Sequence, residues 1–302
     1  MKHKSEKIAG FIIMIFGFAA VISVIAITIY MFIKGLPALY EVGVFPLLFG
    51  KVWKPVAKEP SFGISYIILS SFFGTLGAVI IGVPVGLLTA VFLTEITRDT
   101  KCGRNISRII SAAVELLAAI PSVIYGLLGL MLLNPFMYKL EKIVFSNSST
   151  HKFTGGANML SAIIVLAFMI LPTVINVSSS AIRAVPDSLR SASLALGASK
   201  LQTIFKVIIP AAQSGIMTGV VLGIGRALGE AMAINMVAGG AVNIPLPFNS
   251  VRFLTTQLVS EMSYSGGLHR QVLFTVGLVL YIFIMIINLL LTLLKRKGKI
   301  EK

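Results

Sequence analysis

Six long apolar segments are the feature of this sequence that most limits how the chain can fold. Each is longer than the roughly 20 residues that an α-helix needs to cross the hydrocarbon core of a bilayer. They cover residues 8–33, 66–93, 109–133, 159–182, 211–237 and 271–294. Because a backbone in lipid must satisfy its own hydrogen bonds, such segments fold as helices. The sequence therefore predicts an all-α integral membrane protein, a bundle of six transmembrane helices.

Composition and charge agree with a membrane protein. The 302 residues are 56% hydrophobic and 12% charged, with a mean hydropathy of +0.94, far from a soluble domain. The net charge of +15 could suggest nucleic acid, but 16 of the 26 Lys and Arg residues lie in the two tails and in 95–108 and 183–210. By the positive-inside rule, both termini and the 183–210 loop are then cytoplasmic.

The first apolar segment follows Lys2, Lys4 and Lys7, as it would in a secretory leader. It is longer than the 7–15 residues typical of a signal sequence, and no small-x-small cleavage site follows it. We expect it to remain as a membrane anchor.

No catalytic or metal-binding group of residues can be assembled from the sequence. Cys102 is the single cysteine, and the histidines lie in tails or outer loops, where each is expected to be solvated: His3, His151 and His269. A phosphate-binding P-loop requires Ser or Thr after Gly-Lys, and neither Gly-Lys pair, at 50–51 and 298–299, has one. We therefore expect a non-catalytic chain without a cofactor.

The polar interval 183–210 between the fourth and fifth segments has the pattern of two short helices around a turn at Gly197. Pro186 suits the first turn of the first helix, since that position needs no N–H. Ser199 and Gln202 form a capping box that would begin the second helix. An ordered helix-turn-helix favours a docking element over an amphipathic connector lying on the membrane surface.

Ionisable residues within the apolar segments are the candidates for a transport route. Arg226 and Glu230 lie in the fifth segment and Glu115 in the third, where each charge costs about 2.5–3.5 kcal/mol on insertion scales. At a spacing of four, Arg226 and Glu230 can share a helix face and simply neutralise each other. Alternatively, Arg226 lines an anion route while Glu230 holds its guanidinium. The planar fork suits phosphate, and it suits sulfate too.

The third segment contains Pro121 and Gly126, which predict a kink or break because proline removes a backbone hydrogen bond. Transporters often place substrate near broken helices, although a proline that only shapes the bundle is commoner. Ser122 and Tyr125 are therefore candidate pathway residues.

The 183–210 interval resembles the "EAA" loop of ABC importer permeases. Five positions match the family's spacings: Ala192, Gly197, Val207, Ile209 and Pro210. Ser191 and Ser193 stand where the family has Glu and Ala. In that family the loop is a coupling helix that sits in a cleft of a cytoplasmic ATPase. The resemblance implies a coupling loop that includes Ser191, Ala192, Gly197, Ala198 and Pro210.

Four further segments are similar to the PstC permease family of bacterial phosphate importers. They are GRALGEAMAINMVAGG at 225–240, WKP with Phe62-Gly63 in the first outer loop, IPSVIYGLLGL at 120–130 and SGGLH at 265–269. The sister PstA permeases share the Pro-Ser-x-x-Tyr-Gly and Arg-x-x-Gly-Glu elements, so the tryptophan loop and the Gly-Leu-His segment favour PstC.

This resemblance implies a six-helix ABC importer permease in a bacterial-type cytoplasmic membrane. Its expected partners are a PstA-like permease, two copies of a PstB-like ATPase, a PstS-like phosphate-binding protein, phosphate and membrane lipid. We expect residues 1–65 to form a tail, first helix and outer loop, 66–294 the permease core, and 295–302 a basic cytoplasmic tail. The alternatives are a PstA permease, a sulfate or molybdate permease, a secondary transporter, or a membrane scaffold or sensor.

Overall fold

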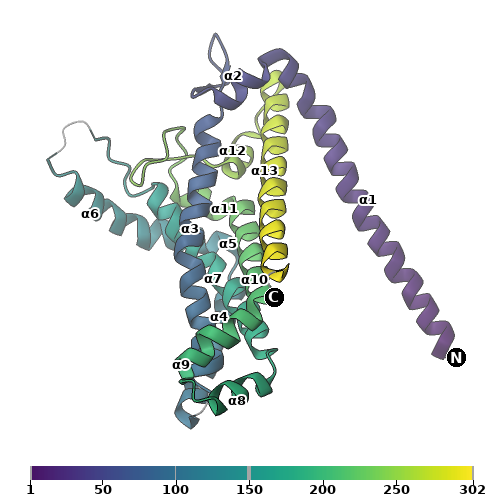
Figure 1. The fold of residues 1–302 in the computed structure, drawn as a ribbon. Helices are drawn as coiled ribbons and strands as arrows, with labels where there is room; N and C mark the ends of the chain where they lie inside the picture. Colours follow the sequence, from purple (N-terminus) through teal and green to yellow (C-terminus); the bar gives the residue numbers. More distant parts are fainter. Residues whose placement is uncertain (1, 99, 148–150, 301–302) are drawn as a thin grey trace.

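A computed structural model describes residues 2–98, 100–147 and 151–300, and within those ranges the chain is mostly helical (Figure 1). The described residues include six helical stretches that are long and apolar enough to cross a membrane, which confirms the predicted fold class. Those stretches are Gly10–Val42, Ser65–Ile96, Ser122–Val144, Met159–Arg183, Lys200–Gly229 and Gly267–Leu293.

The first half of the chain contains α1 (Lys2–Val42), α2 (Val44–Phe49), the hairpin strands β1 (Trp53–Lys54) and β2 (Ser61–Phe62), α3 (Ser65–Val91), the π-helix η1 (Phe92–Ile96), α4 (Lys101–Ala119), α5 (Ser122–Leu128), the π-helix η2 (Gly129–Leu133) and α6 (Asn134–Val144). The second half contains α7 (Met159–Arg183), α8 (Asp187–Ala195), α9 (Lys200–Thr203), the π-helix η3 (Ile204–Ile208), α10 (Ile209–Gly229), α11 (Met232–Val237), α12 (Leu254–Glu261) and α13 (Gly267–Ile300). Helices α8 and α9 lie at one end of the molecule, and α2 and α12 lie at the other (Figure 1).

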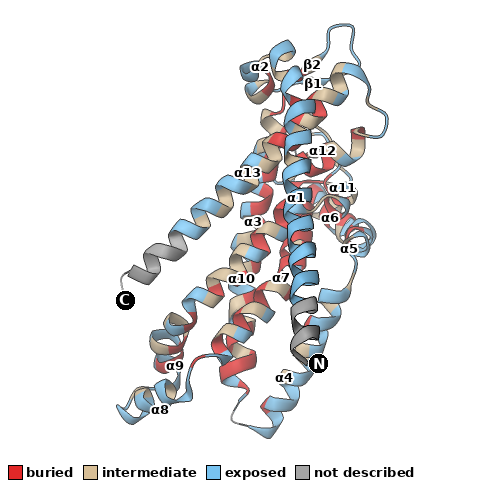
Figure 2. Ribbon diagram, turned by 90° about the vertical axis from the view of Figure 1, so that its right-hand side faces the viewer, coloured by how far each residue is buried: buried red, intermediate tan, exposed pale blue. Residues whose placement is uncertain are grey.

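Helix α7 is the centre of the bundle, with 56% of its most apolar stretch buried against 0% for that of α1 (Figure 2). Glycines on its neighbours let their backbones approach it closely. A Cβ added at Gly82 of α3 would lie 2.7 Å from the Ile170 side chain, and one at Gly223 of α10 would lie 3.1 Å from Val174. Small residues therefore set the packing of α3 and α10 on α7, as expected where lipid supplies no hydrophobic drive between helices.

Helix α1 leans away from the bundle and packs on α13 near its own C-terminal end (Figure 1). The Thr275 hydroxyl donates to the Gly35 carbonyl at 2.7 Å, and a Cβ at Gly35 would lie 3.1 Å from the Thr275 nitrogen. From residue 10 onward, most apolar side chains of α1 are exposed, as suits a helix that faces lipid.

The predicted third span, 109–133, is wrong in its position, although the predicted break at Pro121 is confirmed. Ile120 and Pro121 are extended, with ψ of 126° and 143°, and they separate amphipathic α4 from the spanning stretch Ser122–Val144. The reason is that Pro121 ends one helix and begins another, so apolar residues on both sides belong to different elements. Glu115 consequently lies exposed on α4, outside the candidate spans.

The predicted fifth span, 211–237, lies too far toward the C-terminus, since the observed span is Lys200–Gly229. α10 ends at Gly229, and the spanning stretch begins instead at Lys200. The helix passes through Pro210 because the π turn Ile204–Ile208 precedes it and absorbs the missing backbone hydrogen bond.

The predicted outer loops are partly helical, and their histidines are not simply solvated as expected. His151 Nε2 lies 2.8 Å from Glu141 Oε1 and His269 Nε2 lies 2.9 Å from Glu261 Oε2, with the two imidazoles only 11% and 12% exposed. Each buried carboxylate supplies a partner that draws the imidazole out of solvent. His3 lies outside the residues whose side chains are described, and α13 continues through the predicted basic tail to Ile300.

Candidate functional site

Two helix breaks meet at mid-height of the molecule, where α5 and α11 lie side by side (Figure 1). One break is at Ile120–Pro121 and the other is at Glu230–Ala231, where Glu230 is extended with ψ 129°. A Cβ added at Gly126 would lie 2.8 Å from the Ala233 Cα, so the two short helices touch through their backbones. Interrupted helices of this kind frame substrate sites in many transporters.

Glu230 closes the second break, and it does not pair with Arg226 as the four-residue spacing predicted. Its Oε1 accepts a hydrogen bond from the Ala233 backbone N–H at 2.9 Å and so caps α11. Its carbonyl accepts from the Thr255 hydroxyl of α12 at 2.6 Å. The shared helix face is lost because α10 ends at Gly229, one residue before Glu230.

Arg226 lies in the last turn of α10, exposed on a stretch apolar enough to cross a membrane. Its side chain makes no hydrogen bond or ion pair with any residue that the structure describes. The neighbouring Gly225 and Gly229 have open space where a Cβ would stand, so no described atom packs closely against the helix at these two positions. An arginine in this position needs a partner or water that the chain itself does not supply.

Of the two other predicted pathway residues, the structure brings one near Arg226. Tyr125 is close enough for its hydroxyl to interact electrostatically with the Arg226 guanidinium. The same hydroxyl donates to the Leu117 carbonyl at 2.8 Å, which ties α5 back across the Pro121 break to α4. Ser122 lies in the first turn of α5, half-buried, and its side chain makes no hydrogen bond with Arg226.

The predicted turn and capping box of the 183–210 interval are confirmed. Gly197 has φ +82°, a left-handed conformation that favours glycine, and it separates α8 from α9. The Ser199 hydroxyl accepts from Gln202 N, while the Ser199 backbone N–H donates to Gln202 Oε1 at 2.9 Å. Pro186 lies one position earlier than expected, as the cap residue before α8.

The remaining residues of the predicted coupling loop lie on both sides of the turn. Ser191 and Ala192 are exposed on α8, and the Ser191 hydroxyl donates to the Asp187 carbonyl at 3.1 Å. The Ala198 N–H donates to the Ser193 carbonyl at 3.2 Å, and Pro210 lies half-buried in the first turn of α10. Large apolar side chains are exposed around them, including Leu196 at 89% and Leu194 at 51%. This surface is suited to contact with another protein.

A buried ion pair that the sequence interpretation missed ties α8 to η1. The Arg190 guanidinium lies 2.6 Å from Glu95 Oε1, and the two side chains are 12% and 7% exposed. It also donates to the carbonyls of Val185 at 2.6 Å and Ile182 at 3.0 Å. Arg190 therefore joins the end of the second span to the start of α8.

A second ion pair, which is exposed, lies beside the pair of Arg190 and Glu95. Arg98 donates through both terminal nitrogens to the two Asp187 oxygens at 3.0 Å, in a bidentate arrangement. Its hydrogen bond and charge hold the pKa of Asp187 below the usual value for an aspartate. Residues 89 positions apart in sequence are thus linked, and no local spacing could reveal the pair.

At the opposite end, Glu261 of α12 gathers three outer segments around a cavity of about 650 Å³. Its carboxylate accepts from Trp53 Nε1 at 3.0 Å and Arg252 Nη1 at 2.6 Å, and lies 2.9 Å from His269 Nε2. Trp53 and His269 belong to two of the segments that resemble the PstC family. Their shared partner Glu261 joins the tryptophan loop and the Gly-Leu-His segment at this cavity.

The arrangement defines a class: a multi-pass helical membrane protein with two interrupted helices at its centre and an ordered helix-turn-helix at one end. The chain belongs to the family described as binding-protein-dependent transport system inner membrane component, whose profile matches residues 82–299. It is therefore the membrane permease subunit of an ABC importer.

The chain is also similar to individual named permeases over most of its length. The chain is 37% identical over 281 residues to a probable ABC transporter permease protein, YqgH, of Bacillus subtilis, covering 91% of this chain and 86% of that protein. It is 33% identical to the phosphate transport system permease protein PstC of Mesorhizobium japonicum, covering 80% of this chain and 76% of the relative. The PstC protein of Pasteurella multocida is 30% identical, with 84% and 82% covered.

Solved structures share the fold at low sequence identity. A permease chain of a bacterial alginate ABC transporter matches with a TM-score of 0.58 at 15% identity, covering 93% of this chain and 94% of that chain. A chain of the inward-facing MetNI methionine ABC transporter matches with a TM-score of 0.54 at 24% identity, covering 78% and 94%. These likenesses support the permease fold and say nothing about substrate.

Proposed function

We propose that this chain is a permease subunit of an ATP-driven phosphate importer and forms the anion pathway together with a second, PstA-like permease. The PstC relatives carry phosphate in their names, and the single structural observation that supports the proposal is Arg226. An unpaired guanidinium exposed on a membrane-spanning helix requires an anion, water or another chain beside it. The open face at Gly225 and Gly229 leaves room for a second permease to approach closely.

In this proposal phosphate passes Arg226, with Tyr125 and Ser122 on the facing short helix α5. The guanidinium offers a planar set of donors that matches two phosphate oxygens at once. Glu230 contributes by capping α11, which keeps the helix break open beside Arg226. Glu230 is thus the fourth of the candidate pathway residues predicted from the sequence, after Arg226, Ser122 and Tyr125.

ATP hydrolysis belongs to two PstB-like ATPase subunits, and this chain is non-catalytic. The exposed leucines around Gly197 form the contact surface for one ATPase. Arg190 and Glu95 would transmit its movement from α8 to the end of the second span. Both termini and the α8–α9 end are then cytoplasmic, and a PstS-like protein delivers phosphate at the Glu261 end.

The decisive experiment is uptake by the assembled transporter in proteoliposomes with the binding protein supplied outside. ATP-dependent uptake of labelled phosphate that an excess of sulfate or molybdate does not reduce is the expected result. Uptake of sulfate or molybdate in preference to phosphate would transfer the chain to another oxyanion system. Phosphate uptake that persists without the ATPase would instead indicate a secondary transporter.

A further inference from the structure

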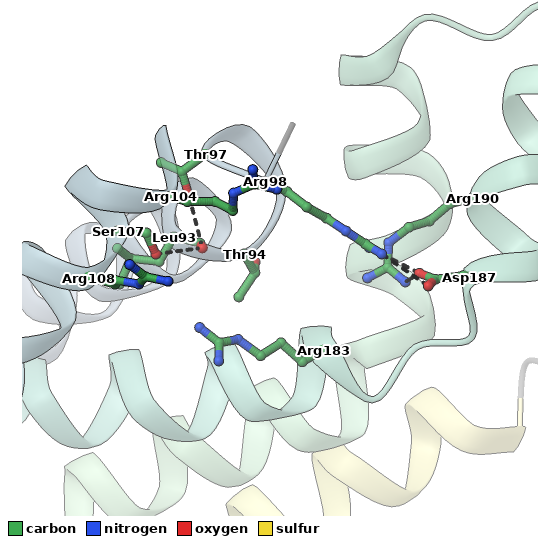
Figure 3. Close-up of a pocket in the computed structure, with 10 residues that line it drawn as sticks. All are labelled: Leu93, Thr94, Thr97, Arg98, Arg104, Ser107, Arg108, Arg183, Asp187 and Arg190. Atoms are coloured by element: carbon green, nitrogen blue, oxygen red, sulfur yellow. Dashed lines mark hydrogen bonds and ion pairs between the residues drawn. The ribbon is translucent and has the colours of Figure 1, made fainter. Parts of the chain in front are cut away.

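A basic cavity of about 400 Å³ lies next to the coupling loop, between η1 and α4 on one side and α7 and α8 on the other (Figure 3). Its charged lining consists of five arginines and one aspartate: Arg98, Arg104, Arg108, Arg183, Arg190 and Asp187. The pathway proposed above does not use it.

Three of these arginines have no partner within the described part of the chain. Arg98 and Arg190 both bind Asp187. The side chains of Arg104, Arg108 and Arg183 make no hydrogen bond or ion pair with any described residue. Figure 3 shows the Arg108 and Arg183 guanidinium groups directed toward the same space between α4 and α7.

Arg104, Arg108 and Arg183 are exposed to solvent, but arginine stays protonated at any physiological pH and like charges repel, so this cluster would stabilise an anion in the cavity. Guanidinium groups from two helices match the several oxygens of a phosphoryl group, which they bind by paired hydrogen bonds. The cavity volume lies in the range of small-molecule sites, so it holds more than a bare ion. Basic pockets between helices at a membrane surface also bind anionic lipid head groups.

The apolar surface proposed for the ATPase is separate from this cavity. Leu194, Leu196 and Leu201 are exposed on α8, the turn and α9, and none of them lines the cavity. A small anion can therefore occupy the cavity while α8 remains available for docking.

We propose that this cavity is a phosphoryl-binding site in which Arg108 of α4 and Arg183 of α7 hold the anion from opposite walls, with Arg104 supplying further charge. The phosphoryl group comes from inorganic phosphate or from the head group of an anionic phospholipid. Because Asp187 and Arg190 form the third wall, an occupied site would also steady α8 against α4. The site stands independently of the transported substrate, since its test involves no transport.

The test uses a thiol placed in the cavity wall of the assembled transporter in nanodiscs, where both membrane faces are accessible. Ser107→Cys lies in the lining, and Cys102→Ser removes the native thiol. The labelling rate of this chain by a negatively charged methanethiosulfonate is measured in phosphatidylcholine, then with inorganic phosphate added, then with phosphatidylglycerol included. The unmodified chain is the matched control, because exposed Cys102 is on the same helix but outside the cavity.

At ten times the Kd of the occupant, mass action leaves about one tenth of the sites empty, so labelling at position 107 should slow about tenfold while labelling of Cys102 is unchanged. Slowing by phosphate alone identifies a soluble anion, and slowing by phosphatidylglycerol alone identifies a head group; either supports the site. Arg108→Gln with Arg183→Gln should abolish the slowing, whereas Lys101→Gln with Lys206→Gln, which removes equal charge outside the cavity, should preserve it.

The proposal fails if neither source slows labelling, or if the double arginine variant is still protected. It also fails if labelling at position 107 is already slow without any phosphate source and speeds up once the ATPase is stripped from the transporter. That outcome would assign the arginines to an acidic surface of the ATPase.

Discussion

The arginine of the coupling helix and the arginine of the broken helix have opposite surroundings. Arg190 of α8 is 12% exposed and donates to the carboxylates of Glu95 and Asp187 and to two backbone carbonyls. Arg226 of α10 is exposed and its side chain makes no hydrogen bond or ion pair with the described residues. Both lie next to apolar helices, where an unpaired charge is costly.

The difference separates a charge that serves the fold from one that serves something outside the chain. The requirements of Arg190 are met by Glu95 and the end of α7, so its role can be complete within this subunit. Arg226 becomes stable in a membrane only when a second chain, water or an anion meets it. The predictions below test this contrast.

The largest effect is expected at Arg226. Arg226→Met should reduce phosphate uptake to background, because it removes the positive charge beside the helix break. Assembly should be unchanged or improved, since a charge within a span costs about 2.5–3.5 kcal/mol on insertion scales. Leu222→Met, one turn away and 52% exposed, is the matched control and should transport normally. Both variants are compared by uptake and by complex yield.

Two further variants at the same position distinguish charge from geometry. Arg226→Lys should retain part of the uptake, because an ammonium keeps the charge but loses the planar fork. The exchange Arg226→Glu with Glu230→Arg should remain inactive, since the two residues do not form a pair that an exchange could restore. Near-normal uptake by the exchanged protein would make Arg226 a structural residue.

A smaller effect, on the docking of α8, is expected at Arg190. Arg190→Met leaves Glu95 buried without a partner, and breaking such a pair costs about 3–5 kcal/mol. Amide hydrogen exchange at the start of α8 should speed up by as much as about a hundredfold, measured on the assembled transporter. Arg98→Met removes the neighbouring exposed pair and should change exchange little. Equal effects of the two substitutions would contradict the distinction between buried and exposed pairs.

The elements that the sequence predicted correctly are those set by local spacing. The capping box at Ser199 and the left-handed turn at Gly197 each depend on residues within a few positions. The break at Pro121 follows from the missing N–H of one residue. The Glu95–Arg190 pair joins residues 95 positions apart, and only the packing of the second span against α8 brings them together.

The pairing of Arg226 with Glu230 was wrong because hydrophobicity gave no sign that the helix ends between them. The segment 211–237 is apolar on both sides of the break, so its composition predicts one continuous span. At the break, the Thr255 hydroxyl of α12 donates to the Glu230 carbonyl, which is a tertiary contact, and the Glu230 carboxylate accepts from the Ala233 N–H three residues ahead and so caps α11. The coupling-loop surface and the pathway remain predictions that the experiments here address.

At Gly197 we expect an effect of about 1–2 kcal/mol, because a residue with a Cβ in the left-handed region is strained by about that amount. Gly197→Val should lower uptake while insertion and complex yield stay normal. The surroundings are open, with no atom within 4 Å of an added Cβ, so any loss comes from backbone strain and not from a clash. Gly197→Asn is the control, since asparagine tolerates this conformation, and it should transport nearly as well as wild type. Normal uptake by the valine variant would remove the turn from the coupling mechanism.

The smallest effect is expected at Glu230. A substitution that keeps the side-chain oxygen but removes the charge separates its role as a hydrogen-bond acceptor from a role as a counter-ion. Glu230→Gln retains an acceptor for the Ala233 N–H, so the cap on α11 and most of the uptake should survive. Glu230→Ala removes the cap and should cost about 1 kcal/mol, typical of an N-cap, with a matching loss of thermal stability of the transporter. If Glu230 instead held the Arg226 guanidinium by charge, the glutamine and alanine variants would fail alike. Uptake and melting temperature measured on both variants therefore decide whether this carboxylate acts as a hydrogen-bond acceptor or as a counter-ion.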